Sequence, residues 1–386
     1  MFTAPSSRSK ASSLAGFPVT VASSVPDSFR GDRSRNVIDC KAAQSLPLRS
    51  RISRALFQPG NYNCASGRAP LVAHHSALAA VLLIMTLSAL ASGGPADKAT
   101  VHFVRGNALA QQGNWAAAVT EYRQALQLRS DFAEAHYNLA NALNARHDRA
   151  AAITEYREAL RLRPDYVPAH NNLALVLRTS GDLAGAVGEL REAIRLQPDY
   201  PEAHFNLGEV LMDQGDLASA ISEYHLALVI DPNDATAAAS LGYALAKSGD
   251  LRHAILELRQ AVRLKPDDVN AHLNLGNALA DTGDFDAAIA EYRLALLLRP
   301  GDAAARDDLG LAFEENGDLT RAVREYRAAI QSQPGDAAAH HNLGRALELT
   351  GDITDAAEQY RAASGLDPGN PRYKNDAARL AGAISK

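Results

Sequence analysis

A 34-residue period runs through the chain from about residue 99 and constrains its fold more than any other feature. The turn signals Gly-Asn or Gly-Asp recur at 113, 181, 215, 249, 283, 317 and 351, with His147-Asp148 in the remaining position. Two uninterrupted columns of alanine keep the same register, as do a column of proline and one of tyrosine or leucine. Such a period is typical of solenoids, whose units each form one supersecondary structure and bury their apolar faces only by stacking.

Each period predicts a hairpin of two helices. Before the turn, Leu207 and Leu211 follow a helical spacing, and after it Ala220, Tyr224 and Ala227 do the same. The proline column then ends the second helix, because proline cannot continue a helix.

The residues between the helices indicate how each helix begins and ends. Gly215 suits the left-handed position after a first helix, and Asp216 can cap the second helix. Asp199 and Glu202 are spaced as a capping box for the next first helix. A histidine in the glycine position, His147, should cost about 1 kcal/mol. We therefore predict an all-α fold.

The columns resemble the tetratricopeptide repeat (TPR) pattern of Leu-Gly, Ala, aromatic, Ala and Pro. One unit meets it with Gly208, Leu211, Ala220, Tyr224, Ala227 and Pro232. The resemblance implies a right-handed α-solenoid of about eight hairpins over residues 98–370, followed by a polar capping helix at 371–386. The family's tryptophan position departs from the pattern and carries His102, His136, His170, His204, Ala238, His272, Arg306 and His340.

An asparagine precedes the Leu-Gly pair in five units, although asparagine is roughly 0.6–0.7 kcal/mol worse than alanine in a helix. The five are Asn138, Asn172, Asn206, Asn274 and Asn342. The wording "AHxNLG" is most similar to the repeats that precede the catalytic region of O-linked N-acetylglucosamine transferases. That resemblance implies an asparagine ladder that holds the backbone of an extended polypeptide along a concave groove. A side-chain amide also matches a peptide group, since it both donates and accepts. The alternative is that the asparagines were copied with the repeat and have no role.

Neighbouring positions extend the predicted peptide site. Apolar and aromatic candidates, which either hold ligand side chains or pack between repeats, are Phe205, Met212, Tyr243 and Leu273. An acidic end of the groove, formed by Asp307, Asp308, Glu314 and Glu315, would take a Lys or Arg of the partner, or is a solvated face.

Catalytic and metal chemistry find little support in these residues. Ligands of one metal lie about 2 Å from it, whereas corresponding histidines on successive hairpins are about 8–10 Å apart, so we expect interior packing with a satisfied ring nitrogen. The repeats carry no phosphate loop and no His-Glu-x-x-His motif. We therefore predict a non-enzymatic protein or peptide scaffold without metal or cofactor. The alternative is a structural module that associates with itself.

Charge divides the chain into two parts. Up to Ala91 there are ten Lys/Arg against three Asp/Glu, whereas the remainder has 29 against 41, a net charge of −12. An acidic array repels phosphate backbones, which counts against nucleic-acid binding.

The N-terminal region does not follow the period. Residues 1–70 are rich in Ser, Arg, Pro and Gly, which indicates a disordered leader, a targeting segment or sequence upstream of a mis-assigned start. Within residues 71–97, the uncharged run 77–91 fits an export signal cleaved after Ala91, an uncleaved membrane anchor, or a buried or spurious segment. We expect an exported protein, periplasmic or extracellular, that contacts a membrane only if 77–91 is retained.

Overall fold

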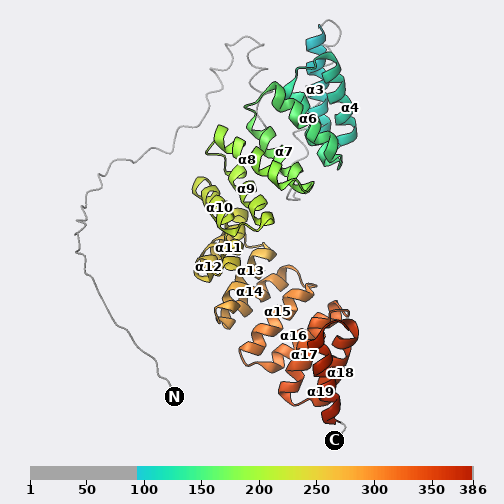
Figure 1. Ribbon diagram of the computed structural model, residues 1–386, viewed down its shortest axis with the longest axis vertical. Coiled ribbons are helices and arrows are strands. Elements are labelled where there is room, and N and C mark those ends of the chain that lie inside the picture. The colour runs from blue at the N-terminus through green and yellow to red at the C-terminus, as the bar shows by residue number, and fades with distance from the viewer. Residues whose placement is uncertain (1–93, 385–386) are drawn as a thin grey trace, which may run out of the picture. The chain divides into compact units, whose positions relative to one another are not determined.

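The computed structural model describes residues 94–384, which belong to the unit Leu71–Lys386. This part of the chain consists of helices without a strand (Figure 1). The leader predicted at 1–70 and the apolar run 77–91 lie outside the described residues.

Sixteen of these helices form hairpins. The first helices are α3 (Pro95–Gln111), α5 (Ala133–Ala145), α7 (Val167–Thr179), α9 (Pro201–Gln214), α11 (Ala235–Ser248), α13 (Val269–Asp281), α15 (Ala303–Glu315) and α17 (Ala337–Thr350). The second helices are α4 (Trp115–Leu128), α6 (Arg149–Leu162), α8 (Leu183–Leu196), α10 (Leu217–Ile230), α12 (Leu251–Leu264), α14 (Phe285–Leu298), α16 (Leu319–Ser332) and α18 (Ile353–Leu366). A last helix, α19 (Pro371–Ile384), follows.

The turn inside each hairpin has the predicted geometry. Gly215 has a φ of 80°, and the Asp216 side chain accepts a hydrogen bond from the Ser219 backbone N–H at the start of α10. His147 adopts a φ of 64° in the same position. Among residues 94–384 it is the one residue other than glycine that has a positive φ. Because every other hairpin has glycine here, His147 marks a locally strained turn.

A small residue on the first helix lets the two helices of a hairpin approach closely. A Cβ atom added at Gly208 would lie 2.6 Å from Cε1 of Tyr224, whose ring is buried against that glycine. Ala220 and Ala227, on either side of the ring along α10, are also buried. The Leu-Gly, tyrosine and alanine columns of the sequence therefore form the core of each hairpin.

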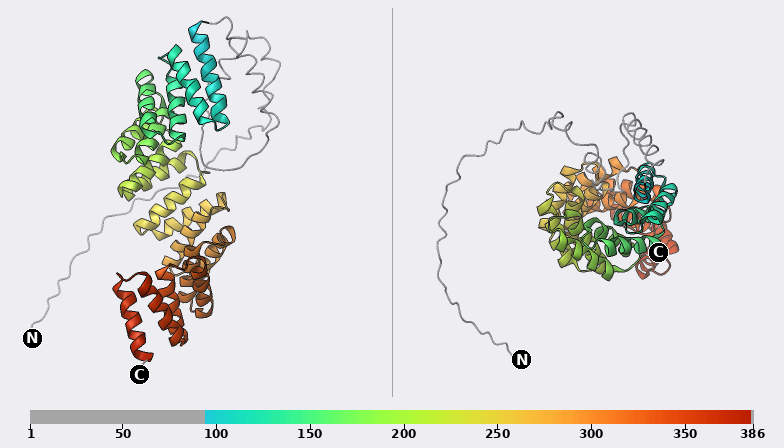
Figure 2. Two further views of the ribbon diagram at one scale, coloured as in Figure 1. Left: turned by 90° about the vertical axis from the view of Figure 1, so that its right-hand side faces the viewer. Right: turned by 90° about the horizontal axis from the view of Figure 1, so that it is seen from above.

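Successive hairpins stack in chain order, and Figure 2 shows them following one another around a common axis. Each second helix packs on the next first helix. Most neighbouring first helices also contact each other, for example α5 with α7 and α13 with α15, more extensively than neighbouring second helices do. The first helices therefore line the inner side of the curve, which we call the inner face, and the second helices the outer face.

The last helix covers the open end of the stack. Arg379 on α19 pairs with Glu348 on α17, and His341 Nε2 lies 3.0 Å from Asp376. The predicted all-α solenoid of eight hairpins and a final helix is thus confirmed for residues 94–384.

One local expectation is wrong. The capping box at Asp199 and Glu202 does not form, because α9 starts one residue later with Tyr200 as its N-cap and Pro201 in its first turn. Proline fixes φ near its helical value and lacks an N–H, so it starts the helix without a side-chain cap. From the fifth hairpin onward an aspartate caps the first helix directly, as Asp234 does for α11.

The expected localisation is also corrected. A membrane span needs about 20 apolar residues, and no helix of residues 94–384 is long and apolar enough to meet that requirement. The prediction of an exported, possibly anchored protein is therefore wrong on this finding.

Candidate functional site

The asparagine column lies on the inner face, where four of its five carboxamides bind the preceding first helix. Asn138 Nδ2 donates to Asn107 Oδ1 at 2.8 Å, and Asn172 Nδ2 donates to Asn141 Oδ1 at 3.1 Å. Both acceptors also receive a hydrogen bond from the tyrosine hydroxyl buried in their own hairpin. The amides therefore join the polar network of one hairpin to the next.

Two further members of the column bond to a different position of the preceding helix. Asn206 Nδ2 donates to Asn171 Oδ1 at 2.8 Å, and Asn342 Nδ2 donates to Asp307 Oδ2 at 2.9 Å. Asn138, Asn206 and Asn342 each use one amide N–H within the protein. Asn172 uses both, because its Nδ2 also donates to the Tyr137 hydroxyl at 3.0 Å. The ladder predicted from the sequence assigned the N–H and the C=O of each side-chain amide to a ligand, and it did not include these bonds within the protein.

Asn274 on α13 differs from the other four. Its carboxamide, which is partly exposed, makes no hydrogen bond with another described residue. The other asparagines bind residues 31 or 35 positions earlier in the chain. For Asn274, those positions are Tyr243 and Ala239 on the preceding first helix, α11. Ala239 has no polar side chain, and the Tyr243 side chain is 43% exposed. Both the donor and the acceptor of Asn274 are consequently available on the inner face.

The neighbouring apolar candidates divide into packed and exposed residues. Phe205 contacts the Tyr224 ring with centroids 5.8 Å apart, and Met212 and Leu273 are partly buried against the core. Tyr243 alone is exposed. Alanine at 239 and leucine at 258 replace the ring pair formed by Phe205 and Tyr224 one hairpin earlier.

The acidic residues predicted in the seventh hairpin are brought together on α15. Burial raises the pKa of both Asp307 and Asp308 to about 6, and the charge of Asp307 adds to the effect on Asp308. Asp307 Oδ1 is buried without a hydrogen-bond partner in the described part of the chain. Glu314 instead binds Arg345 and the Tyr326 hydroxyl, and Glu315 is exposed. The predicted acidic end is therefore centred on the two aspartates.

The histidine column forms a second repeated network between hairpins. His170 Nδ1 lies 2.6 Å from a carboxylate oxygen of Glu189 on α8, and its Nε2 lies 2.9 Å from the backbone carbonyl oxygen of Pro164. The same two contacts recur around His136, His204 and His272, while His340 uses Gln359 and Pro334. The expectation of packed histidines with satisfied ring nitrogens agrees with this geometry.

Both ring nitrogens of these histidines face an acceptor. A neutral imidazole has only one N–H, so both contacts are hydrogen bonds only when the ring is protonated. In the seventh hairpin Arg306, a permanent cation, makes the same two contacts with Glu325 and the Pro300 carbonyl. Burial lowers the pKa of His170, but the bond to Glu189, the Pro164 carbonyl and the charges of Glu189 and Glu192 outweigh it, so the pKa is raised.

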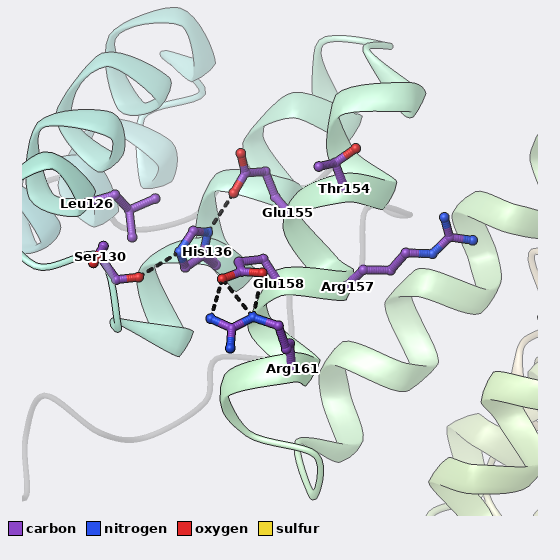
Figure 3. A pocket seen from close by; sticks show the side chains of 8 residues that line it. All are labelled: Leu126, Ser130, His136, Thr154, Glu155, Arg157, Glu158 and Arg161. Atoms are coloured by element: carbon purple, nitrogen blue, oxygen red, sulfur yellow. Dashed lines mark hydrogen bonds and ion pairs between the residues drawn. The ribbon is translucent and has the colours of Figure 1, made fainter.

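A pocket of about 630 Å³ lies beside one of these bridges, away from the asparagine column. Figure 3 shows His136 between Ser130 and Glu155, with Arg161 forked onto Glu158. Burial lowers the pKa of His136, but Glu155, the Ser130 carbonyl and the charge of Glu158 outweigh burial, so the pKa is raised. Most of the polar lining residues bind one another, and they come from two successive hairpins, so this pocket is a junction between hairpins. No group of three or more His, Cys, Asp or Glu residues in 94–384 could hold a metal ion.

Comparison with known families follows the same hairpins. The model described as "TPR repeat" matches residues 106–145, 242–283 and 276–317, and the one described as "Tetratricopeptide repeat" matches 145–201, 171–235 and 308–371. Together they cover 106–235 and 242–371, about two thirds of the chain. The chain belongs to the tetratricopeptide repeat family.

Solved structures of other proteins are similar to the array. The C-terminal part of a TPR repeat-containing protein from Cytophaga hutchinsonii is 17% identical with a TM-score of 0.53, over 62% of this chain and 98% of that one. PilF of Pseudomonas aeruginosa is 21% identical with a TM-score of 0.48, over 55% and 97%. YrrB, described as a TPR protein with an unusual peptide-binding site, is 23% identical with a TM-score of 0.45, over 48% and 96%. At 17% identity the Cytophaga structure supports the fold alone. No curated protein matches the chain.

Several residues of these TPR networks escaped the sequence argument. Asn107, Asn141 and Asn171 accept the inter-hairpin bonds, and Glu189 with its equivalents holds the histidines. The signal was present, because each glutamate lies 19 residues after its histidine in most units. A search for columns of polar residues at a fixed offset would have found it.

Proposed function

We propose that this TPR array is a non-enzymatic scaffold that binds an extended segment of another protein along its inner face. The single observation that carries the proposal is the free carboxamide of Asn274. An extended polypeptide offers an N–H and a C=O at each residue, and one amide side chain can bind both. The resemblance of the wording "AHxNLG" to the transferase repeats implies the same role.

Asn274 places the centre of the proposed site between α11 and α13. Around it, the exposed Tyr243 ring and the partly buried Leu273 offer contacts for apolar side chains of the ligand. Asn138, Asn206 and Asn342 keep a second amide N–H, so they would extend the ladder along the neighbouring helices. Both N–H groups of Asn172 already have acceptors, Tyr137 and Asn141, so Asn172 would join the ladder only by exchanging one of them for the ligand. Phe205 would close the N-terminal side of this central stretch.

The aspartate pair sets the expected charge of the ligand. Asp308 lies one hairpin beyond Asn274 in the same column and makes no hydrogen bond or ion pair with another described residue. A Lys or Arg of the bound segment would neutralise Asp307 and Asp308, which otherwise hold charge in a partly buried setting. We therefore propose a ligand with a basic residue at the C-terminal end of the groove, beside Asp307 and Asp308.

The test is selection of peptides from a random displayed library on the full chain, followed by calorimetry. Asn274→Ala should weaken binding of a selected peptide about three- to tenfold, because one or two hydrogen bonds contribute about 0.5–1.5 kcal/mol each. Gln124→Ala, which removes an exposed amide from the second helix α4 on the outer face, is the control and should leave affinity unchanged. Unchanged affinity for Asn274→Ala refutes the ladder, and failure to select any peptide refutes inner-face binding.

A further inference from the structure

The outer face changes character over three consecutive second helices, α10, α12 and α14. Eleven large apolar side chains are exposed in residues 94–384, and six of these lie on the three helices. The most exposed are Leu297 at 76%, Val229 at 63% and Leu256 at 56%. Exposed apolar residues scattered singly need no explanation, whereas a group confined to neighbouring elements marks an interaction surface.

The repeat itself supplies the comparison for this surface. Hairpins two and three place a glutamate and an arginine at two outward positions, and these pair as Glu158 with Arg161 and Glu192 with Arg195. The first of these pairs is visible in Figure 3. Hairpins four and six carry Leu226 with Val229 and Leu294 with Leu297 at the same positions. Copying of the repeat does not account for this exchange, because the two outward positions differ among units whose cores are alike.

The helix between the two apolar pairs is basic. At the same two positions α12 has Gln260 and Arg263, so this arginine lacks the glutamate that pairs with its equivalents in hairpins two and three. Arg252 and Arg259 on α12 are exposed as well, and none of the three arginines makes an ion pair with another described residue. The positions equivalent to 222, 225, 226 and 229 carry no carboxylate on any of the three helices.

We propose that this surface, Leu226, Val229, Leu256, Leu294 and Leu297 around Arg259 and Arg263, docks an acidic amphipathic helix of a partner protein. Charge complementarity selects the occupant: the arginines are uncompensated within an array whose net charge is negative. Guanidinium groups pair with carboxylates in a fork geometry, and the flanking leucines bury the apolar side of the helix. A second copy of this chain paired about α12 would place arginines against arginines, which opposes that arrangement. The site is separate from the inner face, so it does not depend on the proposed peptide binding.

The experiment uses the full chain and a fluorescein-labelled helical peptide of about 18 residues, with leucine on one face and glutamate on the other. The key variant combines Leu226→Glu, Val229→Arg, Leu294→Glu and Leu297→Arg, which restores the pairs that hairpins two and three tolerate. Fluorescence anisotropy should show binding to the wild type that this variant weakens at least about tenfold, with unchanged circular dichroism and melting temperature. Glu158→Gln with Arg161→Gln on α6 is the control and should bind like the wild type.

Four outcomes overturn the proposal. The first is that the peptide does not bind. The second is that the same peptide with lysine in place of glutamate binds with equal affinity. The third is that sedimentation shows a wild-type dimer, which the four-residue variant abolishes. The fourth is flotation with phosphatidylserine vesicles that depends on the four residues, because it assigns the surface to an anionic membrane.

Discussion

The partly buried aspartate pair on α15 makes a quantitative prediction about stability. Burial and mutual repulsion raise the pKa of Asp308 from 3.8 to about 6. Below pH 3.8 both the folded and the unfolded chain carry a proton there, so the group does not affect stability. Above pH 6 both states carry the ionised carboxylate. Ionisation costs more free energy in the folded state, so the charge lowers the free energy of unfolding. A shift of about 2 units corresponds to a destabilisation of about 3 kcal/mol at neutral pH.

Asp308→Asn removes this effect and restores the residue that the column carries at Asn274 and Asn342. We expect the variant to stabilise the seventh hairpin by about 3 kcal/mol at pH 7.5 and to leave it nearly unchanged at pH 3.5. Because a long repeat array need not unfold in one step, the stabilisation should be measured locally. Amide exchange across Ala303–Glu315 should slow by about a hundredfold at pH 7.5.

The control is Glu315→Gln, which removes a carboxylate from an exposed position of the same helix. It should leave amide exchange unchanged at both pH values. If Asp308→Asn exchanges as fast as the wild type at pH 7.5, or slows equally at both pH values, the assignment of a strained carboxylate pair is refuted.

Two further predictions concern the turns and the histidine bridges. His170→Arg should keep the bridge from Glu189 to the Pro164 carbonyl, because Arg306 makes the equivalent bridge four hairpins later. The raised pKa of His170 means that its bridge is fully present below pH 6.5 and is lost as pH rises through the folded-state pKa, so the variant should protect α7 better than the wild type at pH 8 but not at pH 6. Equal pH dependence of amide exchange in both proteins would contradict this. His147→Gly should raise the free energy of unfolding by about 1 kcal/mol, because glycine adopts a positive φ without strain. The reciprocal Gly215→His should lower the free energy of unfolding. Thermal melts in which His147→Gly destabilises the protein or Gly215→His stabilises it would contradict this reasoning.

The periodic columns were sufficient to predict the hairpins because each column has one local cause. Gly215 needs a left-handed φ, Asp216 caps α10, and Tyr224 packs on Gly208, all within one unit. The start of α9 could not be placed as well, since Asp199 and Tyr200 both precede Pro201 and only the backbone decides which of them is the cap.

The candidate site was less predictable because its properties depend on neighbouring units. Asn206 and Asn274 look alike in sequence, yet one is held by Asn171 and the other has Ala239 and Tyr243 at the equivalent positions. The raised pKa of Asp308 depends on burial that a sequence does not display. The exposed leucines of α10 and α14 likewise require knowledge of which helix faces outward.

The hydrogen bonds of the asparagine column join residues 31 or 35 positions apart, so each connects only adjacent units. Insertion or excision of a whole 34-residue unit would therefore change only the junctions beside that unit and leave every other junction intact. Duplication can change the length of such a chain in whole units while individual copies acquire surface substitutions independently. Recognition can then diversify in one copy without disturbing the stack that carries it.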